Sequence, residues 1–174
     1  MKGLSVLLAS WFYTGFIPPI ILRGMAGTYG SFFSLPLCWA LLRFGHELDT
    51  LWYEAAIFLV FQIGLLTVGP AEKRIGPRID WKGKTKTHDQ NQIVIDETLG
   101  MLITCLPLTF LAITHLYWAL FIAFVLFRVF DIVKVWPTRI FDRMRNPLGV
   151  MLDDAMAGVY AAIVLTLIIK GFHL

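Results

Sequence analysis

Five acidic residues in the second half of this sequence lie at three places, each at one end of a long apolar stretch. Ionisable residues in or beside apolar segments are costly, so each one marks a candidate functional site. Gathered in one partly desolvated cleft, carboxylates repel one another strongly unless cations bind among them. Oxygen ligands, with no Cys and no pair of His nearby, suit Mg²⁺ better than Zn²⁺. We therefore expect a magnesium site made by Asp96, Glu97, Asp131, Asp153 and Asp154.

The competing interpretation of these acids is local. Acidic residues near the N-terminus of a helix stabilise the helix dipole, by about 0.3–1 kcal/mol for each charge. That effect accounts for Asp96 or Asp153 taken singly. It accounts poorly for two adjacent acidic pairs together with Asp131, so a shared site is the favoured interpretation.

Two basic residues lie close to Asp131 in the sequence. Arg128, Asp131 and Lys134 follow one another at intervals of three, so they share roughly one helix face. Two interpretations stay open. The three side chains form an internal ladder of ion pairs, or Arg128 and Lys134 hold a phosphate while Asp131 helps to hold the metal.

Three further features bear on a phosphate site. The stretch Gly27-Thr28-Tyr29-Gly30-Ser31 predicts a flexible turn rich in N–H groups, which suits a phosphate and equally an ordinary interhelical turn. Gly100 and Gly158 each follow an acid by four residues, which lets another helix approach that face. His88 is a possible proton donor beside Asp89, but a solvated loop histidine is the favoured interpretation.

The composition of the chain defines the elements that must position these groups. The 174 residues are 57% hydrophobic and only 16% charged, whereas soluble domains carry about 25% charged residues. This excludes a soluble domain, a disordered chain and a coiled coil. Cys38 and Cys105 both lie within apolar runs and suggest neither a disulfide nor a metal pair. An integral membrane protein remains.

Apolar segments long enough to cross a bilayer should be helices, because lipid offers no partner for backbone polar groups. The sequence predicts an all-α, polytopic membrane bundle, a single domain over 1–174, with five or six segments. We expect Pro107 to kink the fourth segment, and a turn near Ile113–Leu116. Gly15, Pro18 and Pro19 make the first segment a doubtful span, with a re-entrant or interfacial course as the alternative. The expected segments are about 4–22, 28–44, 52–69, 93–113, 116–134 and 150–170.

Charge in the connecting loops predicts the orientation of the bundle. Basic residues dominate 70–92 and 134–147, whereas the charged residues of 44–50 are the acidic Glu47 and Asp49. The positive-inside rule places 22–30, 70–92 and 134–147 in the cytoplasm, and the five carboxylates then lie at the cytoplasmic face. The net charge of +3 reflects these loops and not a nucleic-acid partner.

Several motifs occur together and in order along the chain. The first motif is the glycine-containing stretch 27–31. The second comprises His88-Asp89 and 93–100, the third comprises 127–137 and 141–143, and the fourth comprises 149–154 and Ala157-Gly158. In this combination the sequence resembles the phosphatidylglycerophosphatase A family over about 27–160. It differs from the family pattern at Ala26, before the Gly-Thr pair, and at Val135, where the family has Pro. The stretch 79–87 is interpreted as an insertion.

The resemblance implies a multi-pass bacterial inner-membrane enzyme with its active site facing the cytoplasm. The implied reaction is Mg²⁺-dependent hydrolysis of the phospholipid phosphatidylglycerophosphate to phosphatidylglycerol and phosphate. All five acids are expected to share metal ligation, and an aspartyl-phosphate intermediate stays open as an alternative to direct water attack. The expected catalytic residues are Asp96, Glu97, Asp131 and Asp154, and the expected substrate-binding residues are Arg128, Lys134, Thr28 and Ser31.

Two other functions remain as alternatives from the residues alone. A cation transporter or channel would use the acids as an ion path, but such a path should include acids near the middle of the bilayer. A scaffold subunit would have no use for five converging carboxylates.

Overall fold

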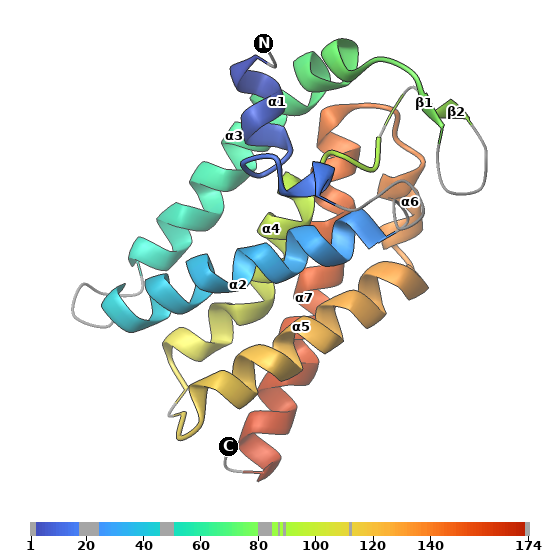
Figure 1. Ribbon diagram of the computed structural model, residues 1–174. Coiled ribbons are helices and arrows are strands. Elements are labelled where there is room, and N and C mark those ends of the chain that lie inside the picture. The colour runs from blue at the N-terminus through green and yellow to red at the C-terminus, as the bar shows by residue number, and fades with distance from the viewer. Residues whose placement is uncertain are drawn as a thin grey trace.

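A computed structural model describes residues 3–17, 25–45, 51–79, 85–86, 88, 90–111 and 113–172 of the chain. These residues are helical apart from turns, short connections and one two-stranded antiparallel pair, β1 (Arg78–Ile79) with β2 (Thr85–Lys86). The predicted all-α class is thus confirmed (Figure 1). The elements are α1 (Leu4–Ala9), the 3-10 turn η1 (Thr14–Phe16), α2 (Ala26–Phe44), α3 (Leu51–Ile75), α4 (Ile95–Cys105), the 3-10 turn η4 (Leu106–Thr109), α5 (Leu116–Val133), α6 (Thr138–Asp142) and α7 (Pro147–Phe172).

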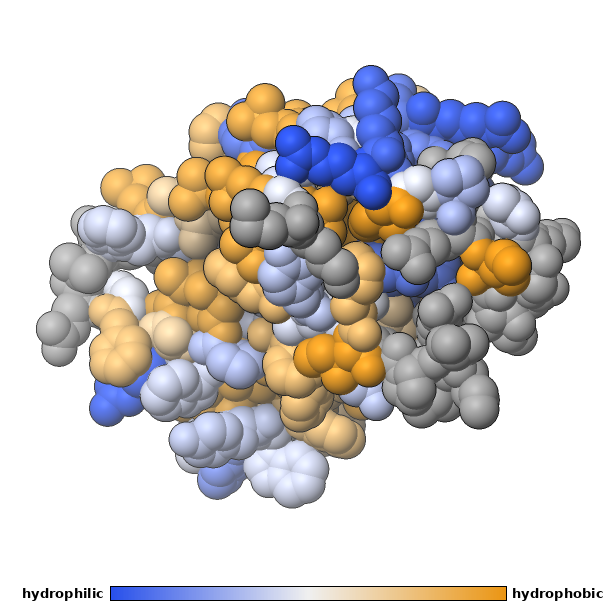
Figure 2. Space-filling model, turned by 45° about the horizontal axis from the view of Figure 1, so that its top comes forward, coloured by the Kyte–Doolittle hydropathy of each residue, from blue (hydrophilic) through white to orange (hydrophobic). Residues whose placement is uncertain are grey.

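Three helices are long and apolar enough to cross a membrane, namely α3, α5 and α7. Less than a third of the most apolar window of each is buried inside the protein, so these helices present apolar side chains outward. Phe58, Phe121 and Leu167 are examples, each more than half exposed. In the space-filling view, orange hydrophobic residues cover much of the body, and the largest blue hydrophilic patch lies at the upper edge (Figure 2). Such a surface is suited to lipid rather than to water.

Two of the six predicted segments are not single long helices over the residues that the structure describes. The first does not continue as a helix over 4–17, because α1 ends at Ala9 and Trp11, Phe12 and Tyr13 adopt positive φ. L-residues continue no helix in that conformation. Its remaining part, with Pro18 and Pro19, lies outside the described residues. The described helices therefore supply three candidate spans, not the five or six predicted.

The predicted segment 93–113 is the second exception. Its α-helix, α4, ends at Cys105 after 11 residues, and η4 follows with Pro107 in its first turn. Pro107 therefore lies where the α-helix stops, rather than at a kink within it. The predicted turn before Leu116 is confirmed, because α5 begins there with His115 as its N-cap residue.

Helix α4 forms the centre of the bundle and packs against α2, α3, α5 and α7. Its contact with α7 is especially close, because a Cβ atom on Gly158 would lie 2.5 Å from the carbonyl oxygen of Gly100. The Thr104 hydroxyl donates to that same carbonyl over 2.8 Å. The predicted role of these two glycines in close helix packing is confirmed.

This packing brings particular helix ends together. In Figure 1 the N-termini of α4 and α7 and the C-terminus of α5 all lie on the side of the molecule that carries α6 and the β1–β2 pair. The turn before α5 and the beginning of α3 lie on the opposite side. Each of the five acids is within the first eight residues of α4 or α7, or in the last turn of α5.

Candidate active site

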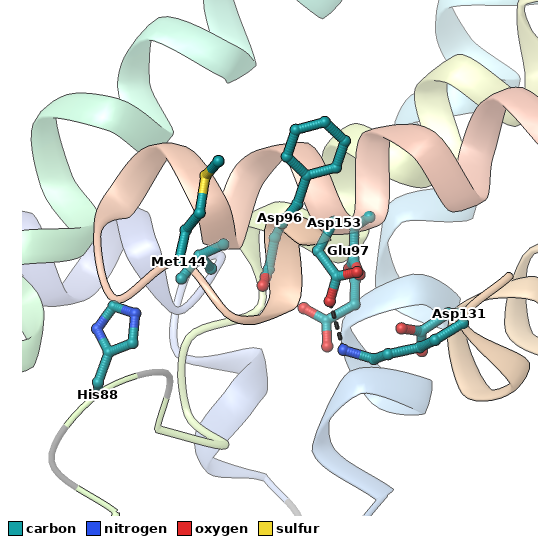
Figure 3. Close-up of a pocket in the computed structure, with 10 residues that line it drawn as sticks. His88, Asp96, Glu97, Asp131, Met144 and Asp153 are labelled. Atoms are coloured by element: carbon teal, nitrogen blue, oxygen red, sulfur yellow. Dashed lines mark hydrogen bonds and ion pairs between the residues drawn. The ribbon is translucent and has the colours of Figure 1, made fainter. Parts of the chain in front are cut away.

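A polar cavity of about 120 Å³ opens where these helix ends meet (Figure 3). All five acids predicted from the sequence line it, so the expected convergence of three helices on one site is a feature of the structure. The lining residues are His88, Asp96, Glu97, Asp131, Lys134, Phe141, Met144, Val150, Asp153 and Asp154.

Three of the five carboxylates form a tight group. One oxygen from each of Asp96, Glu97 and Asp154 lies within 4.8 Å of the others. Asp96 and Asp154 are only 7% and 5% exposed. The buried Oε2 atom of Glu97 has no hydrogen-bond partner among the described residues. We call these three residues the carboxylate triad.

The other two carboxylates are paired with cations. Asp131 receives the Arg128 Nη1 atom at 2.8 Å, which is the i, i+3 ion pair that the ladder interpretation predicted. Lys134, the other cation of the predicted ladder, bonds Asp153 of α7. Lys134 is the C-cap residue of α5 and has a left-handed backbone, with φ of 47°. The two basic residues thus neutralise acids within and beside the cavity.

The predicted substrate-binding residues are distributed unevenly. Lys134 lines the cavity, whereas Arg128, Thr28 and Ser31 are not among the described residues that line it. Ser31 lies beside the site, because its Oγ atom accepts a hydrogen bond from Arg128 Nη1 at 3.3 Å. The expected turn at 27–31 is wrong in form, since these residues already belong to the first turns of α2.

Gly27 explains how α2 reaches the site. A Cβ atom at this position would lie 2.3 Å from Glu97 Oε1 and 3.2 Å from Arg128 Nη1. Only a residue without a side chain allows the α2 backbone to approach this carboxylate and this guanidinium so closely. Together with Gly100 and Gly158, this glycine lets three helices converge at the cavity.

His88 differs from its expected character as a solvated loop residue. Its side chain is 25% exposed, it lines the cavity, and its Nδ1 atom lies 2.6 Å from Glu72 Oε1. Glu72 belongs to α3, which continues six residues beyond the predicted end of that segment. The sequence did not single out Glu72, because this residue falls within the stretch 70–92 that was expected to be a loop. Asp89, the neighbour of His88 in the predicted motif, lies outside the described residues.

The donor set of the carboxylate triad fits a hard divalent cation. Mg²⁺ is bound through a few carboxylate oxygens and keeps its remaining positions for water and phosphate oxygens. Three carboxylates held this close repel one another when ionised, and a cation between them removes that repulsion. The fold and the site therefore define a helical membrane protein with a carboxylate-rich cavity at one end of its bundle.

Comparison with known proteins identifies the family. The phosphatidylglycerophosphatase A family matches residues 7–169. Phosphatidylglycerophosphatase A of Escherichia coli is 34% identical over 168 residues, which cover 96% of this chain and 83% of that protein. A putative phosphatidylinositol-3-phosphatase of Bacteroides thetaiotaomicron is 31% identical over 93% of this chain and 91% of its own length. The chain belongs to the phosphatidylglycerophosphatase A family.

A shorter match agrees with this assignment. Phosphatidylglycerophosphatase A of Haemophilus influenzae is 44% identical over 79 residues, which cover 44% of this chain and 45% of that protein. No solved structure matches this chain.

Proposed function

We propose that this protein hydrolyses the phosphomonoester of phosphatidylglycerophosphate and releases phosphatidylglycerol and phosphate. Family membership supports this substrate, since the family model covers residues 7–169 and the Escherichia coli relative, similar over 96% of this chain, is a phosphatidylglycerophosphatase by name. The observation that carries the chemistry is the carboxylate triad, in which one oxygen from each residue lies within 4.8 Å of the others at the cavity. Asp96, Glu97 and Asp154 would hold Mg²⁺ there. When bound, Mg²⁺ supplies positive charge that polarises the phosphoryl group.

The neighbouring residues have separate tasks. Lys134 lines the cavity, so its ammonium group is available to an oxygen of the substrate phosphate while Asp153 holds its position. The Arg128 guanidinium bonds Asp131 and Ser31, and its buried Nε–H has no acceptor among the described residues. Arg128 thus adds fixed positive charge close to Glu97 as negative charge develops on the phosphoryl oxygens.

The position of the acids favours an enzyme over a cation transporter. A transport path places ionisable groups near the middle of the bilayer, between the two ends of the helices. Here the five carboxylates lie together at one end of α4, α5 and α7, in a single cavity. A lipid phosphomonoester presents its phosphate at the membrane surface, where such a cavity can receive it.

The proposed activity is tested by measuring phosphate release from phosphatidylglycerophosphate by the purified protein in detergent, with Mg²⁺ or with EDTA. We expect release with Mg²⁺ and its loss with EDTA. Phosphatidylinositol 3-phosphate is the informative second substrate, given the name of the Bacteroides relative. Faster turnover of that lipid would change the proposed head group, and no release from either lipid would contradict the phosphatase function.

We further propose that the cavity faces the cytoplasm, as the basic loops 70–92 and 134–147 indicate. Single cysteines test this, since the native Cys38 and Cys105 are buried. Thr114→Cys and Arg145→Cys place exposed thiols before α5 and before α7. In intact spheroplasts a membrane-impermeant thiol reagent should label Thr114→Cys and spare Arg145→Cys. The opposite pattern would place the cavity outside the cytoplasm.

A further inference from the structure

His88 and Glu72 form a pair at the cavity that the carboxylate triad does not involve. The two side chains come from different parts of the chain, Glu72 from the last turns of α3 and His88 from the segment that leads to α4. Their 2.6 Å contact joins Nδ1 of the imidazole to Oε1 of the carboxylate, and Glu72 is only 12% exposed. A contact this short, in a partly buried place, fixes the orientation of the ring.

The orientation determines what the second ring nitrogen can do. The carboxylate accepts a hydrogen bond from the Nδ1–H group, so the proton of the neutral ring stays on Nδ1. The Nε2 atom then has the lone pair that can take up another proton. This Nε2 atom is buried and has no hydrogen-bond partner among the described residues. In Figure 3 His88 lies on one side of Asp96 and Asp131 on the other, so the imidazole borders the cavity away from the ion pairs of α5.

The other ionisable groups at the cavity already have different tasks. Asp131 and Asp153 are ion-paired with Arg128 and Lys134. The triad, from α4 and α7, is the group of oxygens that suits a cation. Among the described residues, the charged groups that line the cavity with His88 are Asp96 and Glu97 of α4, Asp131 of α5 and its C-cap residue Lys134, and Asp153 and Asp154 of α7, while Glu72 of α3 contacts His88 itself.

We propose that His88, held by Glu72, transfers the proton in the hydrolysis, an inference that rests on the proposed function. A water oxygen forms a bond to phosphorus while the bond between phosphorus and the glycerol oxygen breaks. The water proton passes to Nε2 of His88, and the resulting imidazolium gives it to the departing glycerol oxygen. Glu72 stays ionised throughout, stabilises the imidazolium and keeps Nδ1 protonated. His88 is a catalytic residue in this scheme, and Glu72 is a positioning residue.

The test compares two variants at the cavity with two controls of the same residue types. His115 and Glu54 are exposed and lie near the starts of α5 and α3, on the opposite side of the molecule. We expect His88→Ala to lower kcat about a hundredfold or more, in the range that general acid–base catalysis contributes, with little change in KM. Added imidazole should restore at least a tenth of the lost kcat. His115→Gln and Glu54→Gln should stay within about twofold of wild type, since exposed substitutions away from a site change little.

Glu72→Gln supplies a readout that a merely structural role would not change. In ¹⁵N-histidine-labelled protein, the Nδ1 proton of His88 should give a downfield resonance, assigned by its loss in His88→Gln. Glu72→Gln should remove this resonance and lower kcat without raising KM. If His88→Ala fails to fold, His88→Gln takes its place in the kinetic comparison.

Either of two results would overturn the proposal. One is a kcat within threefold of wild type in a folded His88 variant. The other is a loss of kcat that imidazole does not restore in a His88→Ala protein that binds Mg²⁺ as wild type does. Failure of the proposed function is a separate outcome, because wild-type protein would then release no phosphate while the His88 resonance still depended on Glu72.

Discussion

The two ends of this helical bundle contain the same kinds of polar residue in very different surroundings. At one end Glu72 and His88 are partly buried and contact each other at 2.6 Å beside a cavity lined by five carboxylates. At the other end Glu54 and His115 are exposed, and no interaction of either side chain is known among the described residues. Charged residues at the ends of membrane helices are therefore not equivalent. Convergence of several helices, and not residue type, distinguishes a site from a solvated loop.

The largest expected effect comes from removing one charge of the carboxylate triad. Asp154→Asn keeps the size of the side chain but weakens its ligation of a cation, so we expect phosphate release to fall at least about a hundredfold. Loss of groups that only support metal ligands already costs 10–100-fold. Glu54→Gln is the matched control at the other end and should keep wild-type activity. Equal activity of the two variants would mean that the carboxylates at the cavity are no more important for catalysis than an exposed carboxylate at the other end of the bundle.

The next effect tests the close packing that creates the convergence. Gly158→Ala introduces a Cβ atom 2.5 Å from the Gly100 carbonyl oxygen, which is backbone and cannot move aside by itself. We expect a loss of about 1–3 kcal/mol in stability, as for other overpacked cores, and a loss of activity, because α4 and α7 must separate. Thermal unfolding in detergent and phosphate release measure both.

Gly171→Ala is the control for this change, in the same helix α7. A Cβ atom at Gly171 would meet nothing within 4 Å, so the melting temperature should not fall. Because alanine favours a helix over glycine, helix propensity cannot lower the melting temperature of either variant. A similar destabilisation by both substitutions would therefore mean that the α4–α7 contact is not its cause.

A smaller effect is expected from Arg128→Lys. Arg128 Nη1 bonds both Asp131 and Ser31, and a lysine keeps the charge but cannot reproduce the planar guanidinium group. We expect kcat/KM to fall about tenfold, as for the loss of one hydrogen bond to a charged group. Arg43→Lys, at the exposed end of α2, should leave kcat/KM unchanged. No difference between the two variants would exclude Arg128 from the substrate site.

The smallest effect is expected from Ser31→Ala. The Ser31 hydroxyl accepts a long hydrogen bond, 3.3 Å, from Arg128. Its loss should lower kcat/KM about threefold, at the low end of what one hydrogen bond contributes. Thr166→Ala removes a hydroxyl that, among the described residues, bonds within α7 to the Ala162 carbonyl oxygen, and should have no kinetic effect. A hundredfold loss in Ser31→Ala would mean that Ser31 contacts the substrate directly.

The sequence predicted the long helices and the convergence of acids better than it predicted the shorter elements. Hydrophobic runs with charged ends defined α5 and α7 to within a few residues. The sequence already marked the first segment as a doubtful span. It did not show where α1 ends, because the positive φ of Trp11, Phe12 and Tyr13 leaves no mark on hydropathy. The prediction of a long span over 93–113 was wrong, because a helix buried among other helices, such as α4, has the same apolar composition as a helix that faces lipid.

Contacts within the site were harder to predict than its membership. The spacing of Arg128 and Asp131 was sufficient to suggest their ion pair, since both lie on one helix face. The bond of Lys134 to Asp153 depends on a left-handed cap and on the approach of α7, which no local pattern records. The contact between Glu72 and His88 joins residues on either side of the β1–β2 pair, so composition alone could not reveal it.

The central claim is that the carboxylate triad makes one end of the bundle a Mg²⁺ site. Calorimetric titration of Mg²⁺ into the purified protein, without substrate, tests this independently of activity. The account predicts saturable binding to wild type and to Glu54→Gln, and its loss in Asp96→Asn and Asp154→Asn proteins that remain folded. Binding of equal affinity in all four proteins would contradict the account.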